Sequence, residues 1–202
     1  MGHDLVFTLE EKLGQRARRK QKRPEASLLG GRTYEASILE KQQIPTRAHN
    51  LHDFFNALIW LNFPLSKYAL HKRAYEVQSE WSDRHEVQKR CPLADRLTCF
   101  DEGGILFEVS QGQSRSAVEA LIQSRDDINK KAFVERYRES FTLFGHGMME
   151  VMMKGNAAIY ASCIILEAGT DSKDQKLARY LDRFGELSPD HGAVNVSWLL
   201  GI

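Results

Sequence analysis

The segment at residues 54–61 constrains the fold more than any other part of the sequence. Its apolar side chains would cover nearly the whole circumference of a helix, which is typical of a central, buried helix. Asn50 is a good N-cap for this helix, and Asp53 falls at its third position. A carboxylate there can accept hydrogen bonds from the free backbone N–H groups and interacts favourably with the positive end of the helix dipole. Pro64 cannot continue the helix but suits the first turn of another, so the sequence predicts a second helix through residues 65–78.

Length, composition and charge limit the architecture and the partners. The chain has 202 residues, of which 42% are hydrophobic, and this is enough for one domain with a single core. We therefore expect one globular domain over residues 33–202, preceded by a basic segment, residues 1–32, that is helical or mobile. The formal net charge is only +1, so no global field attracts nucleic acid or an anionic membrane.

Several sequence features predict a cytoplasmic protein. The longest apolar stretch is far short of the roughly 20 residues that span a bilayer, so no membrane partner is expected. Residues 1–30 lack the apolar core and cleavage site of a secretory signal. Cys91, Cys99 and Cys163 are odd in number and form no CxxC pattern, which argues against a disulfide framework and a zinc ribbon.

The run RARRKQKR, residues 16–23, is the one local excess of positive charge. One interpretation is an arm that contacts the phosphates of a nucleic acid. The other is the solvated face of an N-terminal helix or a mobile segment. We favour the second interpretation because no aromatic side chains are interleaved with the basic ones, and nucleic acid is therefore not an expected partner.

The remaining periodicity predicts a mainly α protein with a small β-hairpin, an α+β fold. Period-two alternation on either side of the sequence DEGG predicts the hairpin over residues 97–109. A loop is expected over residues 43–50, where it would carry polar groups to the start of the apolar helix. Further helices are predicted over residues 33–42, 114–125, 130–154, 157–168 and 173–187, with an extended or irregular end to the chain.

Polar side chains recur at helical spacing beside the apolar ones. Asp53, Asn56 and Trp60 form one local group, and Lys67 and His71 form another beyond the proline. A buried amide must be hydrogen-bonded, so Asn56 either ties down a neighbouring loop or faces a polar cavity.

The sequence FGHGMME, residues 144–150, places two glycines inside a predicted helix. Each glycine costs roughly 1 kcal/mol relative to alanine in a helix interior, so close packing or function must compensate. His146 and Glu150 are four residues apart and would share one helix face. Such a pair can coordinate a divalent metal, or it can form a plain hydrogen bond, and the spacing does not decide between them.

Three blocks of the sequence resemble a bacterial family catalogued as domain of unknown function 3025. The blocks are IPTRAHNLHDFFNALIWLNFPLSK, DRLTCFDEGG and FGHGMMEVMM, in that order, within residues 33–166. Leu51 stands where the family usually has a tryptophan. The resemblance supplies a set of motifs and implies no activity.

We expect the motif residues to converge on one pocket. Histidines, carboxylates and cations together are what a metal-assisted hydrolase of an anionic substrate needs, and a phosphoester would suit the cations Arg47 and Lys67. A divalent metal is the candidate cofactor, and a small anion is the candidate ligand. We assign metal binding to His52, His146 and Glu150, catalysis to Asp53, Lys67, Asp101 and Glu102, and substrate binding to Arg47, Asn50, Asn56 and Trp60.

A non-catalytic helical module is the alternative hypothesis. In it the same polar groups form a buried network that fixes the packing, and truncating a histidine destabilises the fold by a few kcal/mol. The enzyme hypothesis instead predicts lost ligand binding with little loss of stability. No glycine-rich phosphate loop and no Gly-x-Ser-x-Gly elbow occurs, which removes two enzyme classes without selecting another. The sequence predicts no oligomeric state.

Overall fold

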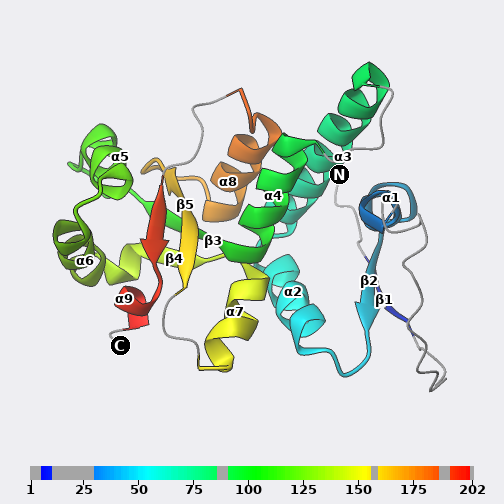
Figure 1. Cartoon of the computed structure of the whole chain (residues 1–202), viewed down its shortest axis with the longest axis horizontal. Coiled ribbons are helices and arrows are strands. Elements are labelled where there is room, and N and C mark those ends of the chain that lie inside the picture. The colour runs from blue at the N-terminus through cyan, green and yellow to red at the C-terminus, as the bar shows by residue number, and fades with distance from the viewer. Residues whose placement is uncertain (1–5, 11–29, 86–90, 156–158, 187–191, 201–202) are drawn as a thin grey trace.

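The structure is a computed structural model that describes residues 6–10, 30–85, 91–155, 159–186 and 192–200 (Figure 1). In chain order its elements are β1 (Val6–Glu10), α1 (Gly30–Lys41), β2 (Gln43–Arg47), α2 (Leu51–Asn62), α3 (Pro64–His85), α4 (Pro92–Gly103), β3 (Gly104–Glu108), α5 (Arg115–Gln123), α6 (Asp127–Arg136), the 3-10 helix η2 (Arg138–Ser140), β4 (Phe141–Leu143), α7 (His146–Met153), β5 (Tyr160–Leu166), α8 (Lys173–Asp182), β6 (Ala193–Asn195) and α9 (Ser197–Leu200). These elements confirm a mainly helical α+β fold. The basic run at residues 16–23 lies outside the described residues, and the proposed division of the chain at residue 32 stays a prediction.

A four-stranded mixed sheet in the order β4-β3-β5-β6 forms a middle layer (Figure 1). β3 runs parallel to β5 and antiparallel to β4, and β6 pairs antiparallel with β5. Successive side chains of a strand point to opposite faces of the sheet. Leu106 and Ile164 therefore pack in one core cluster with α3, α4 and α8, while Phe107 and Ile165 pack in another with α5 and α6. Helices thus cover both faces of the sheet.

β1 and β2 form a separate two-stranded parallel sheet next to α1 (Figure 1). β2 occupies part of the segment at residues 43–50, where only a loop was expected. Ile38 of α1, Ile44 of β2 and Trp60 of α2 make a third core cluster. This cluster fixes α1 and β2 against α2 and α3, and the candidate site lies among these elements.

The expected β-hairpin over residues 97–109 is wrong in its first half, which belongs to α4. Pro92 occupies the start of this helix, and Leu97 and Phe100 are buried at a spacing of three. That helical spacing outweighs the short alternation of apolar residues that suggested a strand. Gly104 then ends the helix in extended geometry, and a Cβ at this position would lie 2.5 Å from the carbonyl oxygen of Phe100. The glycines therefore make a helix-to-strand junction.

The predicted helix over residues 157–168 is also wrong, because this segment contains β5. Cys163 and Ile165 face one side of the sheet and Ile164 faces the other, and all three are buried. A strand that is buried on both faces has a continuous apolar sequence, which periodicity cannot distinguish from that of a buried helix.

The single helix predicted over residues 130–154 is divided into α6, η2, β4 and α7. Phe133 of α6 and Phe141 of β4 both pack against Phe107 of β3, with ring centroids 5.1 and 4.8 Å away. The apolar residues at a spacing of three and four therefore belong to two elements that pack into the same core. They do not form one continuous helix face.

α2 has its predicted bounds but is not buried on all sides. The side chain of Asn50 accepts a hydrogen bond from the backbone N–H of Asp53 at 3.0 Å, and α3 begins at Pro64. One face of α2 packs inward, but Phe54 and Leu61 remain 54% and 68% exposed. Among the residues that the structure describes, no helix combines the length and the apolar character that a membrane span requires.

Candidate functional site

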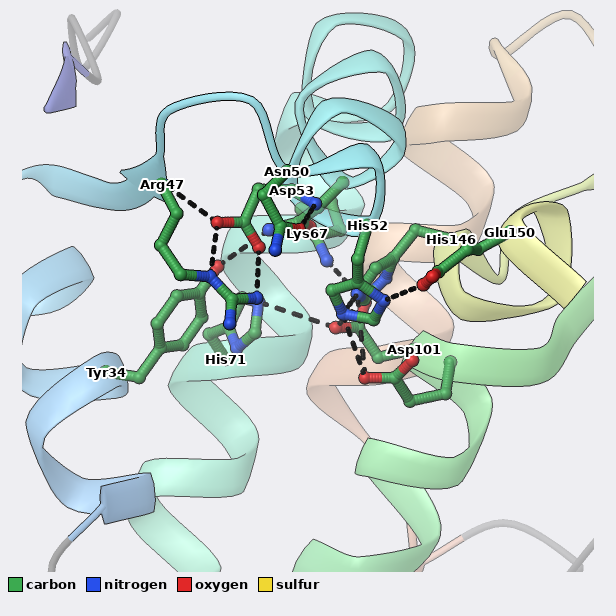
Figure 2. Close-up of polar contacts among 12 residues, drawn as sticks. Tyr34, Arg47, Asn50, His52, Asp53, Lys67, His71, Asp101, His146 and Glu150 are labelled. Carbon is green, nitrogen blue, oxygen red and sulfur yellow. Dashed lines mark hydrogen bonds and ion pairs between the residues drawn. The ribbon is translucent and has the colours of Figure 1, made fainter. Parts of the chain in front are cut away.

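A pocket of about 250 Å³ lies next to the amino end of β3, where α1, β2, α2, α3, α4 and α7 meet. Its walls are formed by Tyr34, Glu35, Pro45, Arg47, His52, Asp53, Asn56, Leu70, His71, Ala74, Thr98, Asp101, Glu102 and His146. Figure 2 shows polar side chains that come from these separate elements and point toward one another. All three sequence blocks contribute to the pocket.

The structure brings most of the predicted site residues together. Those in the pocket walls are Arg47, His52, Asp53, Asn56, Asp101, Glu102 and His146. The other four contact a wall residue from behind, namely Asn50, Trp60, Lys67 and Glu150. The individual roles assigned to these residues from the sequence stay predictions.

His52, Glu102 and His146 form the tightest cluster in the pocket. His52 lies in the first turn of α2, Glu102 near the end of α4, and His146 at the start of α7. The two Nε2 atoms are 3.0 Å apart, and Oε1 of Glu102 lies 3.7 Å from Nε2 of His52 and 3.6 Å from Nε2 of His146. A tetrahedral zinc ion with bonds of about 2.0–2.2 Å holds its ligands roughly 3.3–3.6 Å apart. The three distances, 3.0 to 3.7 Å, bracket this range, so small side-chain movements would let this triad bind one metal ion.

Each histidine of this triad turns its other ring nitrogen toward a carboxylate. Nδ1 of His52 lies 3.2 Å from Oε2 of Glu150, whose other oxygen accepts from Lys154 at 2.6 Å. Nδ1 of His146 lies 3.7 Å from Oδ2 of Asp101, which is longer than a hydrogen bond, and has no hydrogen-bond partner among the described residues. A carboxylate in the position of Glu150 orients a metal-binding imidazole and increases its basicity. Glu150 thus contacts His52, not His146 as the i,i+4 spacing suggested.

The two glycines beside His146 explain how α7 approaches the end of α4. A Cβ on Gly147 would overlap the carboxylate of Glu102, and a Cβ on Gly145 would lie 2.5 Å from the backbone nitrogen of Gly104. A larger residue at position 145 would push the two backbone segments apart, and one at position 147 would displace the Glu102 side chain. Close packing at the triad therefore accounts for the glycine pair that the sequence left unexplained.

Lys67 and Asp101 form a buried ion pair behind the triad. The Lys67 side chain is fully buried, and its Nζ lies 2.5 Å from Oδ1 of Asp101 and 5.6 Å from the ring centroid of Trp60. Burial lowers the pKa of Lys67. Burial raises the pKa of a carboxyl group, but the charge of Lys67 is the largest of the effects that overcome it and lower the pKa of Asp101 to about 2. Asp101 is therefore an anion at neutral pH.

The electrostatics of the triad suit a cation. Burial lowers the pKa of His146 to about 4, so at neutral pH this ring carries a lone pair that can bind a metal. Burial also raises the pKa of Glu102, although His52 opposes this shift. A cation between the three side chains would lower the pKa of Glu102 again and so favour its charged form.

The polar groups at the start of α2 hold the pocket wall together. Asp53 accepts from Nε and Nη2 of Arg47 at 2.9 and 2.8 Å, and from the Arg47 backbone N–H at 2.6 Å. Hydrogen bonds from Arg47 hold the pKa of Asp53 below its usual range. With the Asn50 cap, these contacts fasten β2 to α2 and position the neighbouring His52.

Three ionisable residues of the pocket walls were not assigned from the sequence: Tyr34, Glu35 and His71. His71 was visible as a polar residue one turn after Lys67. Tyr34 lies in the helix predicted over residues 33–42, and nothing in the sequence distinguished Glu35 from other surface acids. Asn56, whose amide was expected to need a partner, donates to the hydroxyl of Tyr34 at 2.9 Å.

Comparison with known proteins gives a family and no activity. The family described as "Protein of unknown function (DUF3025)" matches residues 23–185, which include every residue of the pocket. No curated protein and no solved structure matches the chain.

Proposed function

We propose that this chain, which belongs to the family of unknown function DUF3025, is a metal-dependent hydrolase. The observation that carries the proposal is the triad of His52, Glu102 and His146, whose ligand atoms come from three separate helices and lie 3.0 to 3.7 Å apart. Two histidines and one glutamate are the ligand set of several catalytic zinc sites, which leave a further position open for water.

The surrounding residues have complementary roles in this proposal. Glu150 orients the imidazole of His52, Asp101 places a negative charge 3.7 Å from Nδ1 of His146, and Lys67 keeps Asp101 charged and in place. A bound divalent metal would supply a nucleophile at neutral pH by lowering the pKa of its water. This assignment makes Glu102 a ligand and Glu150 a supporting residue, whereas the sequence had assigned catalysis to Glu102 and metal binding to Glu150.

An anionic substrate, such as a phosphoester, is supported mainly by the proposed cation. Arg47 is already paired with Asp53, and Lys67 is buried against Asp101, so each cation already has a carboxylate partner. A metal ion would still bind an anionic oxygen. Phosphoesters therefore stay in the proposal as one class to test, beside carboxylic esters and amides.

Metal analysis of the untagged protein tests the proposal. We expect near-stoichiometric zinc, manganese or iron in the wild type by plasma mass spectrometry, because two imidazoles and a carboxylate suit all three ions. His52→Ala and Glu102→Gln should lose the metal. His49→Asn is the matched control, since His49 is exposed and has a φ of 56°, which asparagine tolerates. Less than a tenth of an equivalent of metal in the wild type, after incubation with each ion, would contradict the proposal.

An activity screen follows on the metal-loaded protein. Nitrophenyl phosphates, carboxylic esters and amides report hydrolysis by colour. Activity that needs the metal and disappears in Glu102→Gln would establish the hydrolase, whereas a metal-loaded protein that cleaves none of these classes would leave a metal site without this chemistry.

A structural role for the same network is the second candidate. The fully buried Lys67 of α3 joins Asp101 of α4, and His146 of α7 joins His52 of α2, so these contacts tie four helices together. Without an ion, one Nε2 would donate its proton to the other. This candidate predicts that His52→Ala destabilises the metal-free protein by about 1–3 kcal/mol. The nucleic-acid hypothesis for residues 16–23 concerns a segment outside the described residues and stays a prediction.

A further inference from the structure

One part of the pocket is not used by the proposed metal centre. This part, which we call the α1–α3 arm, is formed by Tyr34, Glu35, Asn56 and His71. Figure 2 shows Tyr34 and His71 on the side of the pocket away from His52 and His146. Asp101 lies between the two parts, because its Oδ2 is 3.9 Å from Nε2 of His71 and 3.7 Å from Nδ1 of His146.

The α1–α3 arm contains buried polar atoms that lack hydrogen-bond partners among the described residues. His71 is only 4% exposed, and neither of its ring nitrogens is hydrogen-bonded. Its Nδ1 lies 3.7 Å from Oε1 of Glu35, which is longer than a hydrogen bond. Oδ1 of Asn56, which is 7% exposed, also lacks a partner. Buried polar groups are nearly always hydrogen-bonded, so these atoms point to a ligand that enters the pocket.

Acceptors outnumber donors in the α1–α3 arm. The carboxylate of Glu35, Oδ1 of Asn56 and Oδ2 of Asp101 can only accept hydrogen bonds, while a neutral imidazole at His71 offers one donor and one acceptor. Asn56 uses its amide N–H on the hydroxyl of Tyr34. Burial, followed by the charge of Asp101, raises the pKa of Tyr34, so the phenol keeps its proton and offers one further donor. The acceptors still outnumber the two donors, so a complementary ligand brings N–H donors.

The charge and the rings of the arm favour a cation. Glu35 and Asp101 are the two acidic groups that face His71 from α1 and α4, and Lys67 pairs with the opposite oxygen of Asp101. The Tyr34 ring meets the imidazole edge to face, with centroids 5.2 Å apart. Aromatic faces next to carboxylates are the surroundings in which proteins bind ammonium groups.

We propose that the α1–α3 arm is a binding site for a protonated amine, held by Glu35 and Asn56 beside the rings of Tyr34 and His71. As a statement about the substrate, this inference rests on the proposed hydrolase. The substrate would then carry a protonated amino group that occupies the α1–α3 arm while the bond to be cleaved lies at the metal. As a binding site, it requires no metal and can be tested in the metal-free protein.

Three probes of similar size and different charge test the site in protein treated with a chelator. They are 2-phenylethylamine, which is a cation at neutral pH, the uncharged 2-phenylethanol and the anion 3-phenylpropionate. Ligand-observed NMR and calorimetry measure their dissociation constants. We expect the amine to bind at least about tenfold more tightly than the alcohol, because hydrogen bonds to charged groups contribute about 1.5–3 kcal/mol. The anion should bind more weakly than either.

Variants locate the amine within the pocket. Glu35→Gln should weaken amine binding about tenfold or more, whereas Glu40→Gln, an exposed position on the same helix, should leave it unchanged. His52→Ala should abolish metal binding and keep amine binding. In the wild type, the amine should shift the ring resonances of His71 and the alcohol should not, which tests the site even if Glu35→Gln does not fold.

The outcomes separate the two proposals. Amine binding that survives in the metal-free protein and depends on Glu35 supports the arm whether or not the protein is a hydrolase. Equal binding of amine and alcohol, tighter binding of the anion, or an unchanged dissociation constant in Glu35→Gln would each overturn it, even if the metal centre is confirmed.

Discussion

Replacing Lys67 by methionine should be among the most destabilising substitutions in the protein. The Lys67 side chain is fully buried and pairs with Asp101, whose side chain is 10% exposed. Methionine fills a similar volume, so the main effect is an uncompensated carboxylate. Removing one partner of a buried ion pair costs about 3–5 kcal/mol. The nearby imidazoles of His71 and His146, 3.9 and 3.7 Å from Asp101, place the expected loss toward the lower end of that range.

A double-mutant cycle in chelator-treated protein separates this loss from a packing defect. Urea unfolding, followed by circular dichroism, gives the free energy of unfolding of Lys67→Met, Asp101→Asn and the double variant. These free energies can be compared only if the m-values are equal. The double variant should recover about 2 kcal/mol or more relative to the sum of the single changes, because it leaves no unpaired charge. Lys72→Met, at an exposed position on the same helix, should change the free energy of unfolding by less than about 0.5 kcal/mol. A loss below about 1 kcal/mol for Lys67→Met, or strict additivity in the cycle, would refute this reasoning.

Three further predictions concern the triad. Gly147→Ala should weaken metal binding, because the new methyl group would displace the Glu102 carboxylate. A competition titration with a chromophoric chelator measures the metal affinity. An unchanged affinity would remove Glu102 from the ligand set. Glu150→Gln should reduce metal affinity about 10- to 100-fold in the same assay, because the amide orients the imidazole of His52 less well; full affinity in this variant would show that Glu150 does not support the site. In the metal-free protein, the free energy of unfolding should fall by about 3 kcal/mol as the pH decreases from about 6.5 to 4, because the pKa of His146 is about 4 in the folded state and the unfolded state therefore takes up the proton first. Urea unfolding at several pH values measures this fall, and His146→Asn should reduce it. An equally steep fall in the variant would contradict the assignment.

Local sequence signals were sufficient for the helix that carries His52. Asn50, Asp53 and Pro64 act through the backbone of their own neighbours, so the start of α2 and the turn into α3 could be predicted without tertiary information. The burial of α2 could not be predicted in this way, because apolar residues around a helix do not show which of them neighbouring elements will cover. Phe54 is 54% exposed for this reason.

The strands were harder to predict because their partners lie far away in the sequence. β3 pairs with β5, which begins more than fifty residues later. Its neighbour α4 ends at Gly103, directly before Gly104, the first residue of β3, and the short alternation of apolar residues there resembled one arm of a hairpin. β5 is buried on both faces and therefore lacks the period of two that identifies a half-exposed strand.

The candidate site was predicted as a set of residues but not as a geometry. The three motif blocks meet in one pocket, as expected from their content of histidines and carboxylates. The partner of each group depends on helix orientation, so the sequence paired Glu150 with His146, whereas the structure places it beside His52. Glu35 had no local signal, because its place next to His71 results from the packing of α1 on α3.

X-ray absorption spectroscopy of the zinc-loaded, untagged protein tests the metal centre most directly. The proposed ligands predict only nitrogen and oxygen neighbours, at about 2.0–2.2 Å, with the outer-shell scattering of two imidazoles, and His52→Ala should hold no zinc at this centre. Sulfur neighbours near 2.3 Å would instead assign the ion to the free cysteines Cys91, Cys99 or Cys163. That result, or a zinc ion without imidazole neighbours, would contradict the proposed centre of His52, Glu102 and His146.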